Sequence, residues 1–136
     1  CIRDSIHVVD RSKIAKAINE RVFESTPIDA LLQVNIGDEP QKSGVPTADV
    51  IEVFEELLAF DGLRFRGLMA IPPFGEDPVP HFENLRRLFE EIETTFSPDQ
   101  WTELSMGMSG DFEDAISHGA TIVRVGTAIF GERNYE

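Results

Sequence analysis

The sequence predicts an α/β protein built on a parallel sheet, and two observations carry that prediction. Short apolar runs typical of buried strands alternate five times along the chain with segments whose apolar residues recur at helical spacing. The connections between these segments suit right-handed parallel crossovers and are too short for other topologies. At 136 residues the chain has the length of one domain and can bury a sizeable core.

The amino-terminal half contains two predicted strands and two predicted helices. Ile6–Val9 is a short apolar run, which predicts the first strand. Ser12 is a good helix N-cap and the apolar residues after it share one face, so we expect a helix over Ser12–Glu24. Ala30–Ile36 lies between turn residues and is predicted as the second strand. Thr47–Phe60 has apolar residues at helical spacing and is predicted as a helix.

The carboxyl-terminal half repeats the alternation. The apolar run Leu63–Ile71 predicts a third strand, the proline-rich stretch Pro72–Pro80 a loop, and His81–Phe96 an amphipathic helix. The remaining predicted elements are the strands Thr102–Met106 and Thr121–Val125 and, between them, the helix Ser109–His118. We expect Trp101 and the ten phenylalanines to lie in the core.

Two architectures share this alternation of strand and helix. One is a complete doubly wound sheet of five strands, and the other is a (β/α)₈ barrel, which needs eight units and typically about 250 residues. Five units in 136 residues fit the later part of a barrel as well as they fit an open sheet. Because the sequence begins at Cys1 rather than at a methionine, we expect it to be a fragment of a longer protein.

The composition excludes several classes of partner. A formal net charge of −13 would repel a nucleic-acid backbone or an anionic membrane. A single cysteine cannot form an internal disulfide and suits a reducing compartment. No apolar run approaches the length of about 20 residues needed for a membrane span. The three histidines share no metal-ligand spacing. We therefore expect a cytoplasmic protein with a small-molecule ligand, no metal, no nucleic acid and no membrane.

Both architectures bind ligands beyond the carboxyl ends of their strands. Met108 and Ser109 follow the fourth predicted strand, and a helix that begins at Ser109 would point backbone N–H groups outward. Gly126 and Thr127 follow the fifth strand and offer a second set of N–H groups and another hydroxyl. Both turns together suit a phosphate. The alternative is that Ser109 caps its helix without a ligand, with the acidic residues of the first turn complementing the helix dipole.

Arg124 stands near the end of the fifth predicted strand, two residues before Gly126. A guanidinium at this place would lie near any ligand held by that glycine. The alternative is an arginine paired with a carboxylate at the sheet edge. Taken with the two turns, the pattern indicates an aromatic phosphate or a sugar phosphate as the ligand.

Four stretches of the sequence resemble the pyridoxal 5′-phosphate homeostasis protein family, which itself resembles the barrel domain of alanine racemase. They are LSMGMSGDFEDAISHGATIVRVGTAIFGERNY at 104–135, QVNIGDEPQKSG at 33–44, LRFRGLMAIPP at 63–73 and IHVVD at 6–10. The resemblance implies that residues 1–136 form part of a (β/α)₈ TIM barrel, about strands 4 to 8. It implies binding of pyridoxal phosphate and a link to vitamin B6 and amino-acid homeostasis, without an established catalytic reaction.

The resemblance also implies a role for each site residue. Ser109, Gly126 and Thr127 would hold the phosphate with Met108 beside it, and Arg124 would face the pyridine nitrogen. An arginine stays protonated, so it can donate a hydrogen bond to that nitrogen without giving up a proton. A ring without that proton is a poor electron sink, which restrains carbanion chemistry of the cofactor.

The lysine that forms the Schiff base in this family lies on the first strand, in a segment absent from this sequence. The lysines present are Lys13, Lys16 and Lys42. Lys13 and Lys16 do not match the family motif. Lys42 lies in one of the matching stretches, on a loop at a strand end, where it could approach the ligand; we expect it instead to be a solvated loop residue. No lysine is assigned as the Schiff-base residue. With open sheet edges and an uncovered barrel interior, the chain is expected to associate with itself or with its missing amino-terminal half.

Two enzyme functions remain as alternatives. An amino-acid racemase of this type needs a catalytic tyrosine from an additional β-domain, and the sequence ends at Tyr135-Glu136 just after the last predicted strand. A sugar-phosphate enzyme on a similar barrel would use the same phosphate turns but would not explain Arg124 against a ring nitrogen. Both alternatives are therefore less favoured than a cofactor-binding protein.

Overall fold

A computed structural model of the chain describes residues 5–22 and 26–131. Its strands are β1 (Ser5–Val9), β2 (Ile28–Asn35), β3 (Val45–Pro46), β4 (Leu63–Ala70), β5 (Glu103–Met108) and β6 (Ile122–Arg124). Its helices are α1 (Ser12–Asn19), α2 (Val50–Leu57), α3 (Val79–Phe96), α4 (Phe112–Ser117) and α5 (Thr127–Phe130), and a 3₁₀ turn η1 (Thr47–Asp49) precedes α2. The predicted α/β class is confirmed.

The strands form one parallel sheet in the order β1-β2-β4-β5-β6, and the two-residue strand β3 pairs with β2 outside this path. The strands of the path thus follow one another in space as they do along the chain. A doubly wound sheet reverses its strand order at a switch point, whereas a barrel sheet keeps a sequential order. The sheet is therefore of the half-barrel type, and the doubly wound alternative is excluded.

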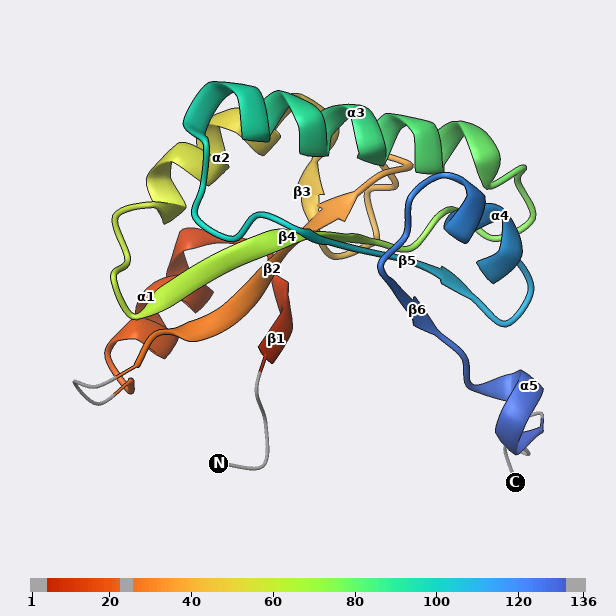
Figure 1. Ribbon diagram of the computed structural model, residues 1–136, viewed down its shortest axis with the longest axis horizontal. Helices are drawn as coiled ribbons and strands as arrows, with labels where there is room; N and C mark the ends of the chain where they lie inside the picture. Colours follow the sequence, from red (N-terminus) through yellow and green to blue (C-terminus); the bar gives the residue numbers. More distant parts are fainter. Residues whose placement is uncertain (1–4, 23–25, 132–136) are drawn as a thin grey trace.

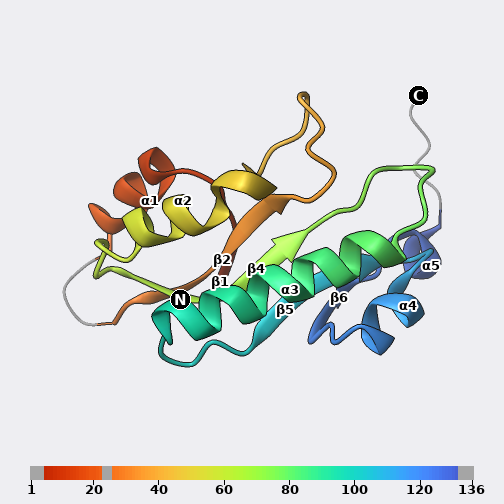
Figure 2. The same ribbon diagram turned by 90° about the horizontal axis from the view of Figure 1, so that it is seen from above.

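Helices α1 to α4 lie on one side of this sheet, and the short helix α5 lies beyond the end of β6 (Figure 1). In both views α2 and α3 run along one face, with α1 beside α2 and α4 beside α3 (Figures 1 and 2). Alternate strand residues point toward these helices and are buried, as the period-2 alternation of strands requires. The buried strand residues in this core include Ala30, Leu32, Val34, Phe65, Leu68, Leu104 and Met106.

Phe54 of α2 is the centre of the aromatic part of the core. Its ring lies 5.9 Å from that of Phe65, 5.5 Å from Phe96 and 5.2 Å from Trp101. Trp101 stacks on Phe89 and donates its indole N–H to the Phe89 carbonyl at 3.1 Å. These contacts join α2, α3 and the sheet into one packed layer. Trp101 is a core residue as predicted.

Phe74, Phe112 and Phe130 are not part of the core, so the prediction for the phenylalanines is wrong at these positions, and Phe23 lies outside the described residues. Phe74 is fully exposed in the loop before α3, and Phe130 is largely exposed at the end of α5. Residue type alone assigns every phenylalanine to the interior, and it does not register that Phe74 lies in a loop or that Phe130 ends a short helix.

Most predicted elements appear close to their predicted bounds, and the differences are local. The predicted helix over 109–118 begins only at Phe112, and the preceding strand extends to Met108. The predicted helix over 47–60 is divided into η1 and α2, and α1 ends at Asn19 rather than at 24, with residues 23–25 outside the described ranges. The short elements β3 and α5 were not predicted, because two and four residues carry no readable periodicity.

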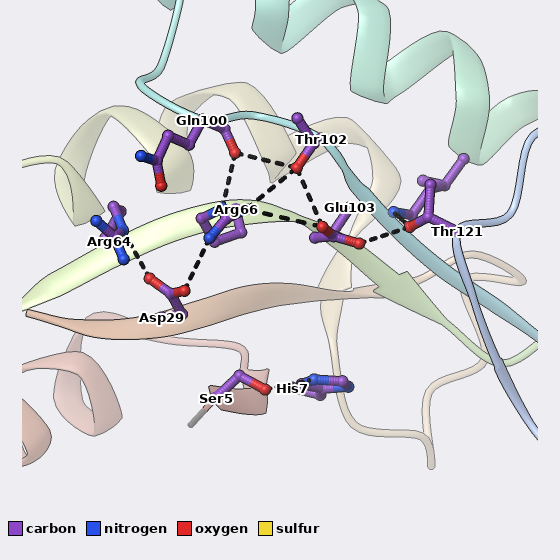
Figure 3. Close-up of polar contacts among 10 residues, drawn as sticks. Ser5, His7, Asp29, Arg64, Arg66, Gln100, Thr102, Glu103 and Thr121 are labelled. Carbon is purple, nitrogen blue, oxygen red and sulfur yellow. Dashed lines mark hydrogen bonds and ion pairs between the residues drawn. The ribbon is translucent and has the colours of Figure 1, made fainter. Parts of the chain in front are cut away.

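The opposite face of the sheet carries a network of charges at its amino edge (Figure 3). Asp29 accepts from Arg64 Nε at 2.6 Å and from Arg66 Nη1 at 2.8 Å. Arg66 also lies 3.7 Å from Glu103, which accepts from the Thr121 hydroxyl at 2.8 Å. Each charge in this network meets an opposite charge from a neighbouring strand, and the arginines and carboxylates balance in number.

Candidate functional site at the carboxyl edge of the sheet

An open cleft of about 960 Å³ lies at the carboxyl ends of β4, β5 and β6. All five predicted site residues line it: Met108, Ser109, Arg124, Gly126 and Thr127. A ligand can touch the arginine and both turns only if they share one side of the sheet, and here they share one cavity. The structure thus brings the predicted residues together, while their role toward a ligand remains a prediction.

Arg124 is fixed by neutral oxygen acceptors. Its Nη1 donates to the Ser105 hydroxyl at 2.7 Å and to the Ser105 carbonyl at 3.2 Å, and its Nη2 donates to the Ala70 carbonyl at 2.8 Å. No carboxylate forms an ion pair with Arg124 among the residues the structure describes. The alternative of an arginine paired at the sheet edge is therefore wrong for the described part of the chain.

The environment of Arg124 acts on its protonation in two directions. Burial lowers the pKa of the guanidinium, and the carboxylate of Asp111 nearby raises it in part. An arginine pKa starts so high that the group keeps its charge at neutral pH. The cleft therefore contains a fixed positive charge that neutral partners hold in place and do not neutralise.

Ser109 connects the two turns of the cleft. Its Oγ accepts from the backbone N–H of Gly126 at 3.2 Å and from that of Ala128 at 3.3 Å. The two N–H groups therefore converge on a single oxygen. The hydroxyl of Thr127, in the same turn, has no hydrogen-bond partner among the described residues. A hydroxyl oxygen accepting from both N–H groups still has its own proton to donate.

The prediction that Ser109 is the N-cap of the following helix is wrong. Asp111 occupies the N-cap position of α4, and its Oδ1 accepts from the backbone N–H of Met108 at 2.6 Å. This bond closes the turn between β5 and α4, which delays the helix to Phe112. Because Asp111 is the N-cap residue, the Ser109 side chain does not cap α4 and instead contacts the turn after β6.

Other residues of the cleft were not predicted. Lys42 lines it, with its Nζ 2.6 Å from Glu39 Oε1 and 3.4 Å from the carbonyl of Pro72. Its loop is shaped by Asn35, whose amide exchanges two hydrogen bonds with the backbone of Glu39. The expectation of a solvated Lys42 is wrong in part, because only 32% of its side chain is exposed. The position of Lys42 in a loop at the carboxyl end of a strand is the signal in the sequence for this placement, and it supported only the less favoured alternative.

The described residues contain no group of three or more His, Cys, Asp and Glu side chains placed to bind a metal ion. Within the same ranges, no helix is long and apolar enough to cross a membrane. The hydrogen-bond donors of the cleft are instead hydroxyls, backbone N–H groups, the Arg124 guanidinium and the Lys42 ammonium, and the carboxylates of Glu76 and Asp111 also line it. That donor set suits an anion with a further acceptor atom, and a phosphorylated pyridine is such a molecule.

Comparison with known proteins gives a consistent result. The family model described as alanine racemase, N-terminal domain, matches residues 2–134. The pyridoxal phosphate homeostasis protein of Aquifex aeolicus is 44% identical over 96% of this chain and 58% of its own length. That of Escherichia coli strain K12 is 42% identical over 97% of this chain and 57% of its own length. The chain thus spans somewhat more than half the length of these curated relatives.

Solved structures agree with these relatives. PipY of Synechococcus elongatus PCC7942, solved with PLP bound, matches with a TM-score of 0.84 at 33% identity, over 94% of this chain and 61% of that one. An unknown protein from Bifidobacterium adolescentis matches with a TM-score of 0.86 at 39% identity, over 93% and 53%. Alanine racemase from Corynebacterium glutamicum shares the fold, with a TM-score of 0.70 at 19% identity, over 95% and 36%. From its sequential sheet and its match along 2–134, the chain belongs to the alanine racemase N-terminal domain family.

Proposed function

We propose that the chain binds pyridoxal 5′-phosphate in the cleft at the carboxyl edge of its sheet. The protein would handle this cofactor in vitamin B6 and amino-acid homeostasis and would not catalyse a reaction. The observation that carries the proposal is the guanidinium of Arg124, held by neutral oxygens in the same cleft as the two N–H-bearing turns. The names of the curated relatives and the PLP-bound PipY structure support it.

The phosphate would be held by the turns around Ser109. The N–H groups of Gly126 and Ala128 now donate to the Ser109 oxygen, and they would pass to a phosphate oxygen if Ser109 turned aside. The hydroxyls of Ser109 and Thr127 would then donate to the same group, and Met108 would lie beside it. Hydrogen bonds to a charged acceptor are about twice as strong as neutral ones, so this exchange is favourable.

Arg124 would donate to the pyridine nitrogen. Three hydrogen bonds to β4 and β5 keep the guanidinium from swinging toward the phosphate, so it acts as a fixed donor. Because Arg124 keeps its proton, it would hold the ring nitrogen unprotonated. The bound cofactor supplies a reactive aldehyde and an electron-withdrawing ring. An arginine at the ring nitrogen limits the electron withdrawal by the ring. A cofactor held in this way is better suited to storage and transfer than to catalysis.

We also propose that residues 1–136 form a partial barrel domain, about strands 4 to 8 of a (β/α)₈ barrel. The sequential strand order and the coverage of 58% of the Aquifex relative support this assignment. The outer strands of the path, β1 and β6, would then pair with the missing amino-terminal half or with a second copy. The Schiff-base lysine expected from the resemblance would come from that half, and the single cysteine suits the cytoplasm.

Equilibrium titration tests the cofactor proposal. We expect the chain to bind pyridoxal phosphate at least about tenfold more tightly than pyridoxal, because the phosphate contacts would add charge-assisted hydrogen bonds. The matched pair of variants is Arg124→Gln in the cleft and Arg87→Gln on the exposed face of α3, where Arg87 pairs with Glu91. Equal affinities for the two ligands, or equal losses in the two variants, would contradict the proposal.

A further inference from the structure

Exposed apolar side chains gather at the rim of the cleft. Phe74 is 102% exposed and Phe130 85%, and Ile71 and Met108 are each about 40% exposed. All four line the cleft. A fully exposed phenylalanine keeps its whole apolar surface in water, which is unfavourable. Binding of a ligand or partner that packs against the ring would remove this cost.

The loop that carries Phe74 is fixed at both ends. At its start, the carbonyl of Pro72 accepts from Lys42 Nζ at 3.4 Å. At its end, Glu76 pairs with His81 on the first turn of α3 at 2.9 Å. Between these points Gly75 has a φ of +83°, and a Cβ built there would meet no atom within 4 Å. The two anchored ends place Phe74 at the edge of the cleft. The open space around Gly75 leaves the middle of the loop free to adjust.

The position of Arg124 indicates which end of a bound ligand lies near this loop. Its Nη2 donates to the carbonyl of Ala70, the last residue of β4, and the chain then runs directly through Ile71 to Phe74. The phosphate-binding turns lie on the other side, after β5 and β6. A ring whose nitrogen meets Arg124 is thus next to the apolar segment before α3.

We propose that Phe74 packs against the face of the pyridine ring and is the residue that selects a planar aromatic ligand. The proposal rests on the proposed binding of pyridoxal phosphate in this cleft and adds a contact that the phosphate turns do not provide. An electron-poor pyridine and a phenyl ring attract each other in offset or edge arrangements. Because the loop ends are already anchored, ordering its tip on the ligand costs little conformational freedom.

Affinity measurements on variants of Phe74 test this contact. We expect Phe74→Ala to weaken the binding of pyridoxal phosphate about tenfold and Phe74→Leu to weaken it less. Phe74→Trp should leave the affinity unchanged. The affinity for glycerol phosphate, which has the phosphate but no ring, should be the same in all three variants as in the unmodified chain when it is measured by competition. Ile116→Ala removes an exposed apolar side chain from α4, outside the cleft, and serves as the matched control.

The outcomes separate this proposal from the one it rests on. If the unmodified chain binds pyridoxal phosphate and Phe74→Ala binds it equally well, the Phe74 contact is overturned while the cofactor site stands. If the unmodified chain does not bind the cofactor, both fail together. If Phe74→Ala changes the sedimentation of the chain and leaves the affinity unchanged, Phe74 contacts another protein surface and the ring contact is overturned.

Discussion

Two arginines on the uncovered face of the sheet, at its opposite edges, differ in their partners. Arg66 at the amino edge faces Asp29 and Glu103, so its charge is matched within the chain (Figure 3). Among the described residues, Arg124 at the carboxyl edge donates hydrogen bonds only to oxygens of Ser105 and Ala70. Both are partly buried in the same sheet. A paired charge therefore supports the fold, while a fixed charge with neutral partners is available to a ligand.

The largest expected effect comes from removing the available charge. Arg124→Gln should weaken pyridoxal phosphate about a hundredfold, because a hydrogen bond from a charged donor contributes about 1.5–3 kcal/mol in a buried site. The free energy of unfolding should change less, since Arg124 forms no ion pair with a described carboxylate and feels Asp111 only at longer range. Calorimetric titration and urea denaturation of the same sample measure both quantities.

The reverse result is expected at the amino edge. Arg66→Gln leaves Asp29 and Glu103 without their shared cation, and the free energy of unfolding should fall by about 1–3 kcal/mol. Affinity for pyridoxal phosphate should stay within about twofold, because the network lies at the far edge from the cleft. If Arg66→Gln weakened ligand binding as much as Arg124→Gln does, the amino edge would also contribute to ligand binding, contrary to the proposed difference between the two edges.

Ser109→Ala should give a smaller change, and only toward ligands that carry a phosphate. Loss of one hydroxyl donor to a charged group is expected to weaken pyridoxal phosphate about tenfold. Pyridoxal, which lacks the phosphate, should bind equally well to Ser109→Ala and to the unmodified chain. A similar loss for both ligands would show that Ser109 acts through the shape of the turn rather than on the phosphate.

The smallest effect is expected at Asp10. It follows β1 at the carboxyl edge, yet its charge is satisfied within the chain: the bidentate hydrogen bonds from Arg11 lower its pKa most, and the Gly44 N–H lowers it further. A depressed carboxyl pKa adds stability above the unfolded value of about 4, and this is lost as pH falls through the folded pKa.

Asp10→Asn should therefore lower the free energy of unfolding at neutral pH and flatten its fall below about pH 4. Denaturation at a series of pH values measures this slope. Cofactor affinity at neutral pH should not change, because Asp10 is not among the residues that line the cleft. An unchanged pH slope in Asp10→Asn would mean that the Asp10 carboxylate does not stabilise the loop at Gly44.

The fold could be predicted from the sequence because the buried strands are long apolar runs with clear neighbours. Leu63–Ala70 and the helix after it, for example, lie within a few residues of their predicted bounds. The edge at which ligand residues gather also follows from parallel topology alone. Met108, Ser109, Arg124, Gly126 and Thr127 are therefore found in one cleft, as predicted.

The bonding within the cleft could not be predicted in the same way. The partners of Arg124 are 19 and 54 residues away along the chain, so no local pattern reveals that they are neutral. Ser109 was expected to cap a helix, and its true contacts with Gly126 and Ala128 depend on the four-residue helix α5. Phenylalanine is a residue type typical of cores, so residue type predicts a buried Phe74. It is exposed because its loop runs outside the packed layers.

A crystal structure of this chain with pyridoxal phosphate would show whether the cleft binds the cofactor in the proposed orientation. We predict that the phosphate accepts hydrogen bonds from the Ser109 hydroxyl and the Gly126 N–H. We also predict that the ring nitrogen accepts a hydrogen bond from Arg124, with Ser105 and Ala70 still holding the guanidinium. A ligand bound elsewhere, or one whose phosphate rather than its ring contacts Arg124, would contradict the proposed site.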